Sequence, residues 1–282
     1  MNHLLCFGFG FTAAALSKRL DLSQWKVTGT SRSDEGVTAI KALGHGGLRF
    51  DEMNSIPDSV THILSSVPPS AQGDPAVLRF GERLNRPFKW IAYLSTTGVY
   101  GDRAGGVVTE DSEIKPNSDR ARRRVLAEAA WAKFNSHIFR LPGIYGPGRN
   151  QLESVKDGTA RRVIKQGQIF SRIHVDDIAG ILLASIDSPN PGRIYNVADD
   201  FPCPPQDVVT FAASLLKVLP PPEIEFEQAD LSPMARSFYD DSKRVSNARI
   251  KSELGYRLIY PDYKTGLMAI FNNSPHLHVR PS

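Results

Sequence analysis

Residues 4–13 read Leu4-Leu5-Cys6-Phe7-Gly8-Phe9-Gly10-Phe11-Thr12-Ala13, a short apolar run followed by a glycine turn. The apolar run is too short for a helix and predicts a buried strand of a parallel sheet. The turn follows the pattern G-x-G-x-x-A, and residues 13–20 predict a helix. Strand, glycine turn and helix in this order are typical of a dinucleotide-binding α/β fold. The sequence therefore predicts a Rossmann-type, doubly wound parallel sheet.

The glycine turn is also the first predicted cofactor site. Gly8 permits the tight turn, Gly10 lets a pyrophosphate approach the backbone, and Ala13 is small enough for close packing of helix and strand. The free N–H groups and the positive end of the helix dipole favour phosphate there. The predicted contacts of the turn are Gly8, Phe9, Gly10, Phe11 and Thr12. The alternative is an ordinary strand-to-helix turn that binds no ligand.

Composition limits the classes of function. The chain has 282 residues, 41% of them hydrophobic and 23% charged, which is typical of a globular protein with a sizeable core. The formal charge of +4 suits an anionic small ligand, and the chain lacks the long basic runs that favour nucleic acid as a partner. No apolar stretch reaches the length of about 18 residues expected for a membrane span.

The two cysteines, Cys6 and Cys203, have no disulfide or metal-ligand spacing. They favour a reducing compartment, so a cytoplasmic location is expected. The N-terminal apolar run has no basic segment before it and ends in the glycine turn, so a signal peptide is not expected. We predict no metal site.

The end of the second predicted strand, residues 25–30, bears on the choice of cofactor. An acidic residue there would bind the ribose 2′-hydroxyl of NAD and repel a 2′-phosphate. The chain instead has Ser31 and Arg32, whose hydroxyl and guanidinium groups suit a phosphate. NADP is therefore predicted as the cofactor, with NAD less favoured. The alternative is that Arg32 is a solvated loop residue.

Two further strands contribute predicted cofactor contacts. Residues 48–51 predict a third strand, whose Asp51 could lie near the adenine edge or in an exposed turn. Residues 62–67 predict a fourth strand that ends before two prolines. Its carboxyl end should border the cofactor crevice, which places Ser65, Ser66 and Val67 in the cofactor-binding set.

The middle of the chain resembles a known family. The fifth predicted strand continues into Tyr93-Leu94-Ser95-Thr96-Thr97-Gly98-Val99-Tyr100-Gly101, which resembles the strand-end signature of extended short-chain dehydrogenases, the sugar-nucleotide epimerase/dehydratase group. Three blocks follow in the family's order: residues 140–149 ("RLPGIYGPGR"), 172–179 ("RIHVDDIA") and 195–198 ("YNVA"). The tail, residues 243–256, resembles the ending of the same group. The resemblance implies a nicotinamide cofactor and an oxidoreductase or epimerase activity.

The catalytic motif of that family is broken here. Members carry a Ser or Thr, a Tyr and a Lys, and counting back from Val99 places Thr96 on the hydroxyl position. The Tyr-x-x-x-Lys pair should precede Glu128 by eight and four residues, which are Arg120 and Arg124. Arg124 could still bind a ribose. Arginine is effectively never deprotonated, so Arg120 cannot replace tyrosine as a general acid.

Two tyrosines are candidate replacements for the missing acid. Tyr100 and Tyr145 follow strands at the carboxyl edge of the sheet, where catalytic groups gather in such folds. Their alternative role is packing within the family's turns. The arginines at positions 120 and 122–124 form either an anion-binding patch, with Arg120 and Arg124 on one helix face, or a solvated surface.

The resemblance also implies substrate contacts and further cofactor contacts. Thr97, Arg149, Arg172 and His174 are the predicted substrate-binding residues, and Leu141 and Gly143 join the cofactor-binding set. Surface charge is the alternative for both arginines. His174 with its neighbouring aspartates is expected to hold structure through buried hydrogen bonds.

The predicted organisation is a core domain at residues 1–150, whose sheet is completed by about residues 170–200. Residues 151–168 and 200–273 would form a smaller substrate lobe, and residues 274–282 a loose tail. Two functions remain open. One is an NAD(P)-dependent enzyme acting on a small polar or phosphorylated substrate. The other is a catalytically impaired cofactor sensor or interaction protein, with a homodimer expected by resemblance.

Overall fold

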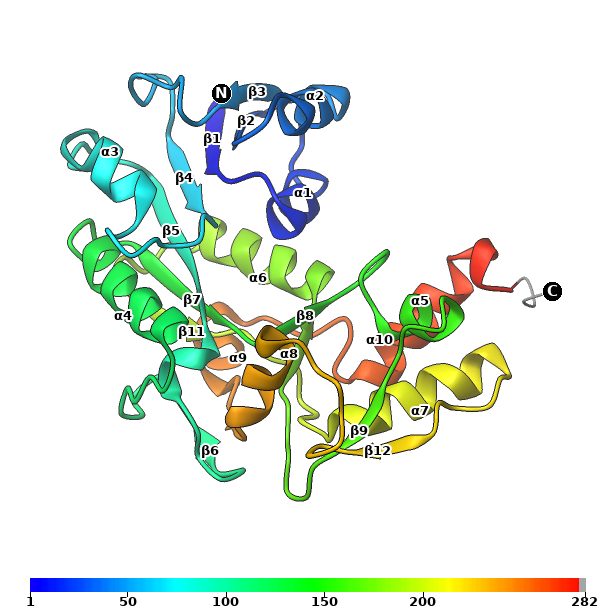
Figure 1. Ribbon diagram of the computed structural model, residues 1–282. Helices are drawn as coiled ribbons and strands as arrows, with labels where there is room; N and C mark the ends of the chain where they lie inside the picture. The colour runs from blue at the N-terminus through cyan, green and yellow to red at the C-terminus, as the bar shows by residue number, and fades with distance from the viewer. Residues whose placement is uncertain (279–282) are drawn as a thin grey trace.

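The fold is built on a parallel sheet at the centre of the molecule. The structure is a computed structural model that describes residues 1–278. The sheet has seven parallel strands in the order β11-β7-β5-β4-β1-β2-β3. The strands are β1 (Asn2–Phe7), β2 (Trp25–Ser31), β3 (Gly46–Arg49), β4 (His62–Ser65), β5 (Trp90–Thr96), β7 (His137–Leu141) and β11 (Ile194–Asn196). Chain growth in both directions from β1 confirms the predicted doubly wound, Rossmann-type fold (Figure 1).

Helices cover both faces of the sheet because successive strand residues point to opposite sides. Leu4 and Cys6 pack with α1 (Phe11–Ser17), α6 (Val175–Asp187) and α9 (Ala248–Leu254). Leu5 and Phe7 pack on the other face with α3 (Pro75–Leu84) and α4 (Asp119–Ala132). The helix α2 (Asp34–Ala42) lies against β2 and β3 at one edge. Burial on both faces explains why β1 is apolar throughout.

Some predicted boundaries differ from the structure. The third strand runs from Gly46 to Arg49 rather than over residues 48–51, because it pairs with Thr28–Ser31 of β2. Asp51 therefore lies in the turn after the strand. Within the predicted smaller lobe, the helix α7 (Pro205–Leu216) ends where Lys217 takes a left-handed conformation. The strand β12 (Glu223–Glu225) follows it.

A second group of elements lies beyond the carboxyl edge of the sheet. The helices α5 (Gln151–Lys156), α7 and α10 (Tyr263–Asn272) share a separate apolar cluster that includes Leu152, Val208 and Leu267. Two strand pairs join them: β8 (Gly143–Tyr145) with β10 (Arg172–His174), and β9 (Arg162–Ile164) with β12. The range predicted for the smaller lobe also contains α9, which packs against the main sheet.

A short strand pair fixes residues 233–245 against an earlier part of the chain. The helix α8 (Pro233–Ser237) and the 3₁₀ turn η2 (Phe238–Asp240) lead into β13 (Arg244–Val245), which pairs with β6 (Val107–Val108). Just before β13, the carbonyl of Ser242 accepts hydrogen bonds from the backbone N–H groups of Arg103 and Gly105. The segment after η2 is thereby held against residues 102–108.

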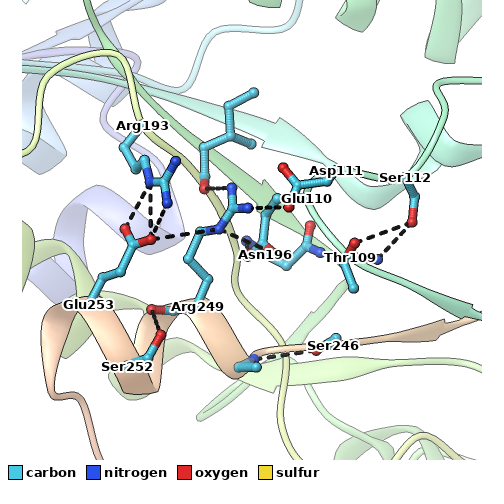
Figure 2. Close-up of polar contacts among 12 residues, drawn as sticks. Thr109, Glu110, Asp111, Ser112, Arg193, Asn196, Ser246, Arg249, Ser252 and Glu253 are labelled. Carbon is cyan, nitrogen blue, oxygen red and sulfur yellow. Dashed lines mark hydrogen bonds and ion pairs between the residues drawn. The ribbon is translucent and has the colours of Figure 1, made fainter.

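An ionic network anchors α9 to the edge of the sheet (Figure 2). The Arg249 guanidinium lies 2.6 Å from Asp111 Oδ2 and donates to the carbonyl of Ile194 in β11. Glu253 pairs with Arg193, and the buried Glu110 accepts a hydrogen bond of 2.8 Å from the N–H of Asn196. These contacts connect α9 with β11 and the loop before α4.

The C-terminal residues that the structure describes are folded. The turn η3 (Pro275–His278) follows α10, and Leu277 is buried in the same apolar cluster as α5 and α7. Lys156 of α5 donates a hydrogen bond to the carbonyl of His276. This part of the range predicted as a loose tail is therefore packed, and residues 279–282 lie outside the described residues. Among residues 1–278, no helix has the length and apolar character needed to cross a membrane.

Candidate functional site

A cavity of about 490 Å³ opens at the carboxyl ends of β1, β4, β5 and β7. Its walls come from the glycine turn, the start of α4, the β8 and β10 segments, and the segment around η2. The lining residues are Gly10–Thr12, Ser66, Leu94–Gly98, Asn117, Ser118, Arg120, Ala121, Arg124, Leu141–Ile144, Arg149, Ile169–Arg172, Ser237, Phe238, Asp241, Lys243 and Val245. Ligands of doubly wound sheets bind at this edge.

The glycine turn has the geometry that a phosphate cradle needs. Gly8 has φ of +80°, a left-handed conformation that favours glycine, and its N–H donates to Thr30 Oγ1 at 2.9 Å. A Cβ atom built on Gly10 would meet nothing within 4 Å, so the backbone there is open to the cavity. Phe11 and Thr12 line the cavity, whereas the ring of Phe9 packs over Gly29 of β2. The turn fits the diphosphate of a dinucleotide.

The two residues predicted to select the cofactor lie at the end of β2. Ser31 is half-buried as the last residue of the strand, and Arg32 is exposed directly after it. Both lie outside the cavity lining described above. Arg32 is thus accessible to a phosphate, and its role stays a prediction.

Asp51 is engaged by neighbouring arginines. Its carboxylate accepts two hydrogen bonds from Arg49, at 3.0 and 2.6 Å, and its carbonyl accepts one from Arg79. The hydrogen bond from Arg49 holds the pKa of Asp51 below its ordinary value. The structure therefore favours the exposed-turn alternative for Asp51, outside the cavity.

The end of β4 contributes one cavity residue. Ser66 lines the cavity and donates a hydrogen bond of 2.8 Å to the carbonyl of Gly8, which ties β4 to the glycine turn. Ser65 is fully buried, and its Oγ has no hydrogen-bond partner within the described structure. Val67 packs against the cluster on the α3 side of the sheet.

The end of β5 brings hydroxyl groups to the cavity. Thr96 and Thr97 both line it. Thr96 Oγ1 accepts a hydrogen bond of 3.1 Å from the N–H of Gly98 and so caps the 3₁₀ turn η1 (Thr97–Tyr100). The Thr96 oxygen keeps its own proton available for a ligand oxygen, as the predicted role requires.

The two arginines predicted on one face of α4 both reach the cavity. Arg124 Nη1 donates to Tyr93 Oη at 2.7 Å and to the carbonyl of Leu94 at 2.9 Å, so its guanidinium is fixed at the end of β5. Arg120 lies with its Cζ 5.9 Å from the ring centroid of Phe238. Arg122 and Arg123 are exposed, and Arg122 pairs with Asp119. The spacing of four residues places Arg120 and Arg124 on the side of α4 that faces the cavity.

The two candidate tyrosines point away from the cavity. Tyr100 is fully buried, donates to Asn196 Oδ1 at 2.7 Å and accepts from Arg140 at 2.9 Å. Tyr145 donates to the carbonyl of Asp262 at 3.3 Å, and burial raises the pKa of its hydroxyl far above the ordinary value. Both contacts favour the packing alternative, because a proton donor must reach the substrate.

His174 is buried at the start of α6. Its Nδ1 accepts a hydrogen bond of 3.1 Å from the N–H of Asp176 and caps that helix. The ring packs against Tyr145 and Tyr260, and burial lowers its pKa to about 4. These contacts favour the structural role of His174, and the ring is not part of the cavity lining given above.

The remaining predicted residues lie in the cavity wall. Leu141 and Gly143 form its floor where β7 leads into β8. Arg149 lies with its Cζ 5.9 Å from the ring centroid of Phe11, next to the glycine turn. Arg172 is held by the carbonyl of Phe170 and by Cys203. Arg149 thus lies beside the glycine turn, and Arg172 lies in the wall formed by β10.

Many lining residues were not predicted from the sequence, among them Asn117, Phe238, Asp241 and Lys243. Lys243 is 7% exposed, and its Nζ lies 2.9 Å from Asp241 Oδ2. Asn117 donates to the other oxygen of Asp241. Tyr239 and Lys243 have the Tyr-x-x-x-Lys spacing, but they lie in and after the short turn η2 and not on a long helix. The ring of Tyr239 packs against Phe170 and Phe226. Apart from this spacing no local pattern marks the group, which reaches the cavity through the pairing of β13 with β6.

The cavity is strongly cationic. Five of its lining side chains carry positive charge, namely Arg120, Arg124, Arg149, Arg172 and Lys243, against the single carboxylate of Asp241. Arg124 and Arg172 donate to neutral oxygen and sulfur acceptors. The excess of positive charge favours an anionic ligand. Within residues 1–278 no cluster of three His, Cys, Asp or Glu side chains is arranged to hold a metal ion.

Comparison with known proteins places this geometry in a family. No family model matches the chain. A solved structure of a functionally unknown conserved protein from Silicibacter pomeroyi DSS is 47% identical, covers 97% of this chain and 99% of its own, and superposes with a TM-score of 0.92. The chain belongs to the family of that protein. That protein is described as functionally unknown, so it assigns no activity to the family.

Two further solved structures connect the fold with nicotinamide enzymes. A Methylobacillus flagellatus protein described as an NAD-dependent epimerase/dehydratase is 26% identical, with coverage of 97% and 98% and a TM-score of 0.74. The human epimerase family protein SDR39U1, solved with NADPH, is 19% identical, covers 97% of this chain and 100% of its own, and has a TM-score of 0.73, which speaks for the fold. The fold is that of the extended short-chain dehydrogenases.

Proposed function

We propose that the protein is an NAD(P)-dependent oxidoreductase or epimerase that acts on a small, anionic, polar substrate. The observation that carries the proposal is a cavity lined by both the open glycine turn and five cationic side chains. Its epimerase/dehydratase-like structural neighbours support a nicotinamide cofactor. When bound, such a cofactor supplies or takes up a hydride at a substrate carbon.

The residues of the chain divide the work along the cavity. Gly10, Phe11 and Thr12 are suited to hold the diphosphate, and Arg149 adds positive charge at that end. Thr96 and the fixed guanidinium of Arg124 are suited to orient the reacting part of the ligands. Arg120 and Arg172 remain for the charged group of the substrate, which is consistent with a nucleotide sugar or another phosphorylated molecule.

We further propose NADP as the preferred form of the cofactor. Arg32 is exposed at the end of β2 and has no acidic neighbour at positions 30–33 that would repel a 2′-phosphate. A charge-assisted hydrogen bond contributes about 1.5–3 kcal/mol, which corresponds to roughly 10- to 100-fold in affinity.

The test is a calorimetric titration of the purified protein with NADPH and with NADH. We expect NADPH to bind more tightly. In the Arg32→Ala variant the affinity for NADPH should fall by roughly 10- to 100-fold, while that for NADH stays within about twofold. The matched control is Arg83→Ala, which removes an exposed arginine from α3, far from the turn. Equal affinities in the wild type would contradict the NADP preference.

A turnover screen with UDP-glucose and UDP-glucuronic acid follows the titration. Formation or consumption of NADPH during the assay, or interconversion of the sugar, supports catalysis. Tight NADPH binding without turnover of any sugar nucleotide would favour a cofactor sensor. Such a sensor must bind the oxidised and reduced cofactor with different affinities, because only differential affinity shifts a conformational equilibrium. Failure to bind either cofactor would contradict the whole proposal.

A further inference from the structure

The cavity contains few groups that can exchange a proton. Of its ionisable lining side chains, four are arginines, which stay protonated at accessible pH. The lining described for residues 1–278 includes no tyrosine, histidine, cysteine or glutamate, since Tyr100, Tyr145 and His174 point elsewhere. Asp241 and Lys243 are the side chains that remain. Among the ionisable side chains of the lining, these two are therefore the candidates for a proton donor.

Lys243 is held in a fixed position. Its Nζ lies 2.9 Å from Asp241 Oδ2, and the other Asp241 oxygen accepts from Asn117, so the carboxylate is committed to the protein on both sides. Ser242, between them, donates its N–H to Asp102 Oδ1 at 2.8 Å, and its carbonyl accepts the N–H groups of Arg103 and Gly105. An acid needs such a defined geometry to act on one substrate atom.

The surroundings of Lys243 also suit proton transfer. The side chain is 7% exposed, and burial lowers the pKa of its ammonium group, which brings it closer to neutral pH. Asp241 and Asp102 act against this shift, and Arg103 acts with it. The other charged groups that line the same cavity are Arg120, Arg124, Arg149 and Arg172, and each favours the neutral amine.

We propose that Lys243 is the general acid and base of this site, with Asp241 as the residue that positions it. This inference rests on the proposed function. When a substrate carbonyl is reduced, a proton moves from Lys243 Nζ to the carbonyl oxygen: an N–H bond breaks and an O–H bond forms. The carbonyl carbon takes the hydride of the reduced nicotinamide, and the neutral amine regains its proton from water. The substrate class is thus a molecule with a carbonyl or secondary alcohol near its anionic group.

The deciding test needs no substrate. The intact protein is labelled with acetic anhydride at a series of pH values, and the labelling of each lysine is quantified by peptide mass spectrometry. The labelling midpoint of Lys243 should lie below that of the exposed Lys133, and Asp241→Asn should lower the midpoint of Lys243 further. Saturating NADPH should slow labelling of Lys243 at least fivefold and leave Lys133 unchanged. Equal midpoints, or no protection under conditions where calorimetry shows that NADPH is bound, would overturn the proposal.

Variants separate proton transfer from charge. With a sugar nucleotide that is turned over, Lys243→Met and Lys243→Arg should both lower kcat by roughly 10²- to 10⁴-fold, because arginine keeps the charge but does not release its proton. The affinity for NADPH should stay within about twofold, and Lys133→Met should match the wild type. Wild-type kcat in Lys243→Arg would overturn the proposal. If the wild-type protein does not bind NADPH, the proposed function is contradicted, whatever the labelling midpoint of Lys243.

Discussion

At the scale of single residues, the wall of the site depends on a buried ion pair behind it. Arg140 of β7 and Glu128 of α4 lie 2.7 Å apart, and both are almost fully buried. Ser95, which lines the cavity, donates to Glu128 at 2.5 Å, and Arg140 also donates to Tyr100. Because these groups satisfy one another, removing one partner leaves a buried charge without compensation.

We therefore predict that Glu128→Gln lowers the free energy of unfolding by about 3–5 kcal/mol. The measurement is urea denaturation followed by circular dichroism. Glu82→Gln on the exposed surface of α3 is the matched control and should change the unfolding free energy by less than about 0.5 kcal/mol. A Glu128→Gln protein as stable as the wild type would show that the pair is dispensable for folding.

At the scale of elements, the docking of the segment after α9 on α6 depends on one glycine. A Cβ atom on Gly180 would lie 2.2 Å from the hydroxyl of Tyr256, which donates to Asp177 at 3.0 Å. Asp177 also accepts the backbone N–H groups of Ile259 and Tyr260. The absence of a side chain at position 180 thus lets the segment after α9 dock on α6.

The contrast between two helical glycines provides a test. Gly180→Ala should lower the free energy of unfolding by about 1–3 kcal/mol, because the new methyl group displaces Tyr256. Gly81→Ala in α3, where a Cβ atom meets nothing within 4 Å, should instead raise it by about 0.4–1 kcal/mol through the lower entropy of the unfolded chain. The measurement is thermal unfolding of both variants. Changes in the unfolding free energy that have the same sign in Gly180→Ala and Gly81→Ala would contradict the packing argument.

At the scale of the whole molecule, buried titratable groups give stability a dependence on pH with two opposing signs. Burial lowers the pKa of His62 to about 4, so between pH 6.5 and 4 the unfolded chain binds more protons at this group than the folded one. Burial raises the pKa of Asp199 to about 8, so the folded protein binds more protons there between pH 4 and 8. Acidification therefore destabilises through His62 and stabilises through Asp199.

Two variants should reveal these opposite contributions. Relative to His62→Gln, the wild type should lose up to about 1.4 kcal/mol of unfolding free energy per pH unit as the pH falls from 6.5 to 4. Relative to Asp199→Asn, the wild type should lose stability as the pH rises from 4 to 8. Urea denaturation at pH 5, 6, 7 and 8 measures both differences. Differences that do not change with pH would contradict the burial of these groups.

Much of the fold and part of the site could be predicted from local patterns. The apolar strand, the glycines at positions 8 and 10 and the following helix act through backbone conformation, which is set within a few residues. The helical spacing of Arg120 and Arg124 predicts their common direction in the same way. The ends of parallel strands meet at one edge, so Thr96 and Ser66 could be placed beside the turn.

The remaining site residues depended on the tertiary structure. Tyr100 and Tyr145 follow the strands as expected, but packing turns their hydroxyl groups to Asn196 and to the carbonyl of Asp262, which lie 96 and 117 residues away in the chain. Lys243 reaches the cavity because β13 pairs with β6. The sequence by itself determined the parallel sheet and its glycine turn, since both follow from local backbone preferences. Only the tertiary structure decided which side chains can exchange a proton in the cavity, because burial and direction arise from contacts between distant segments.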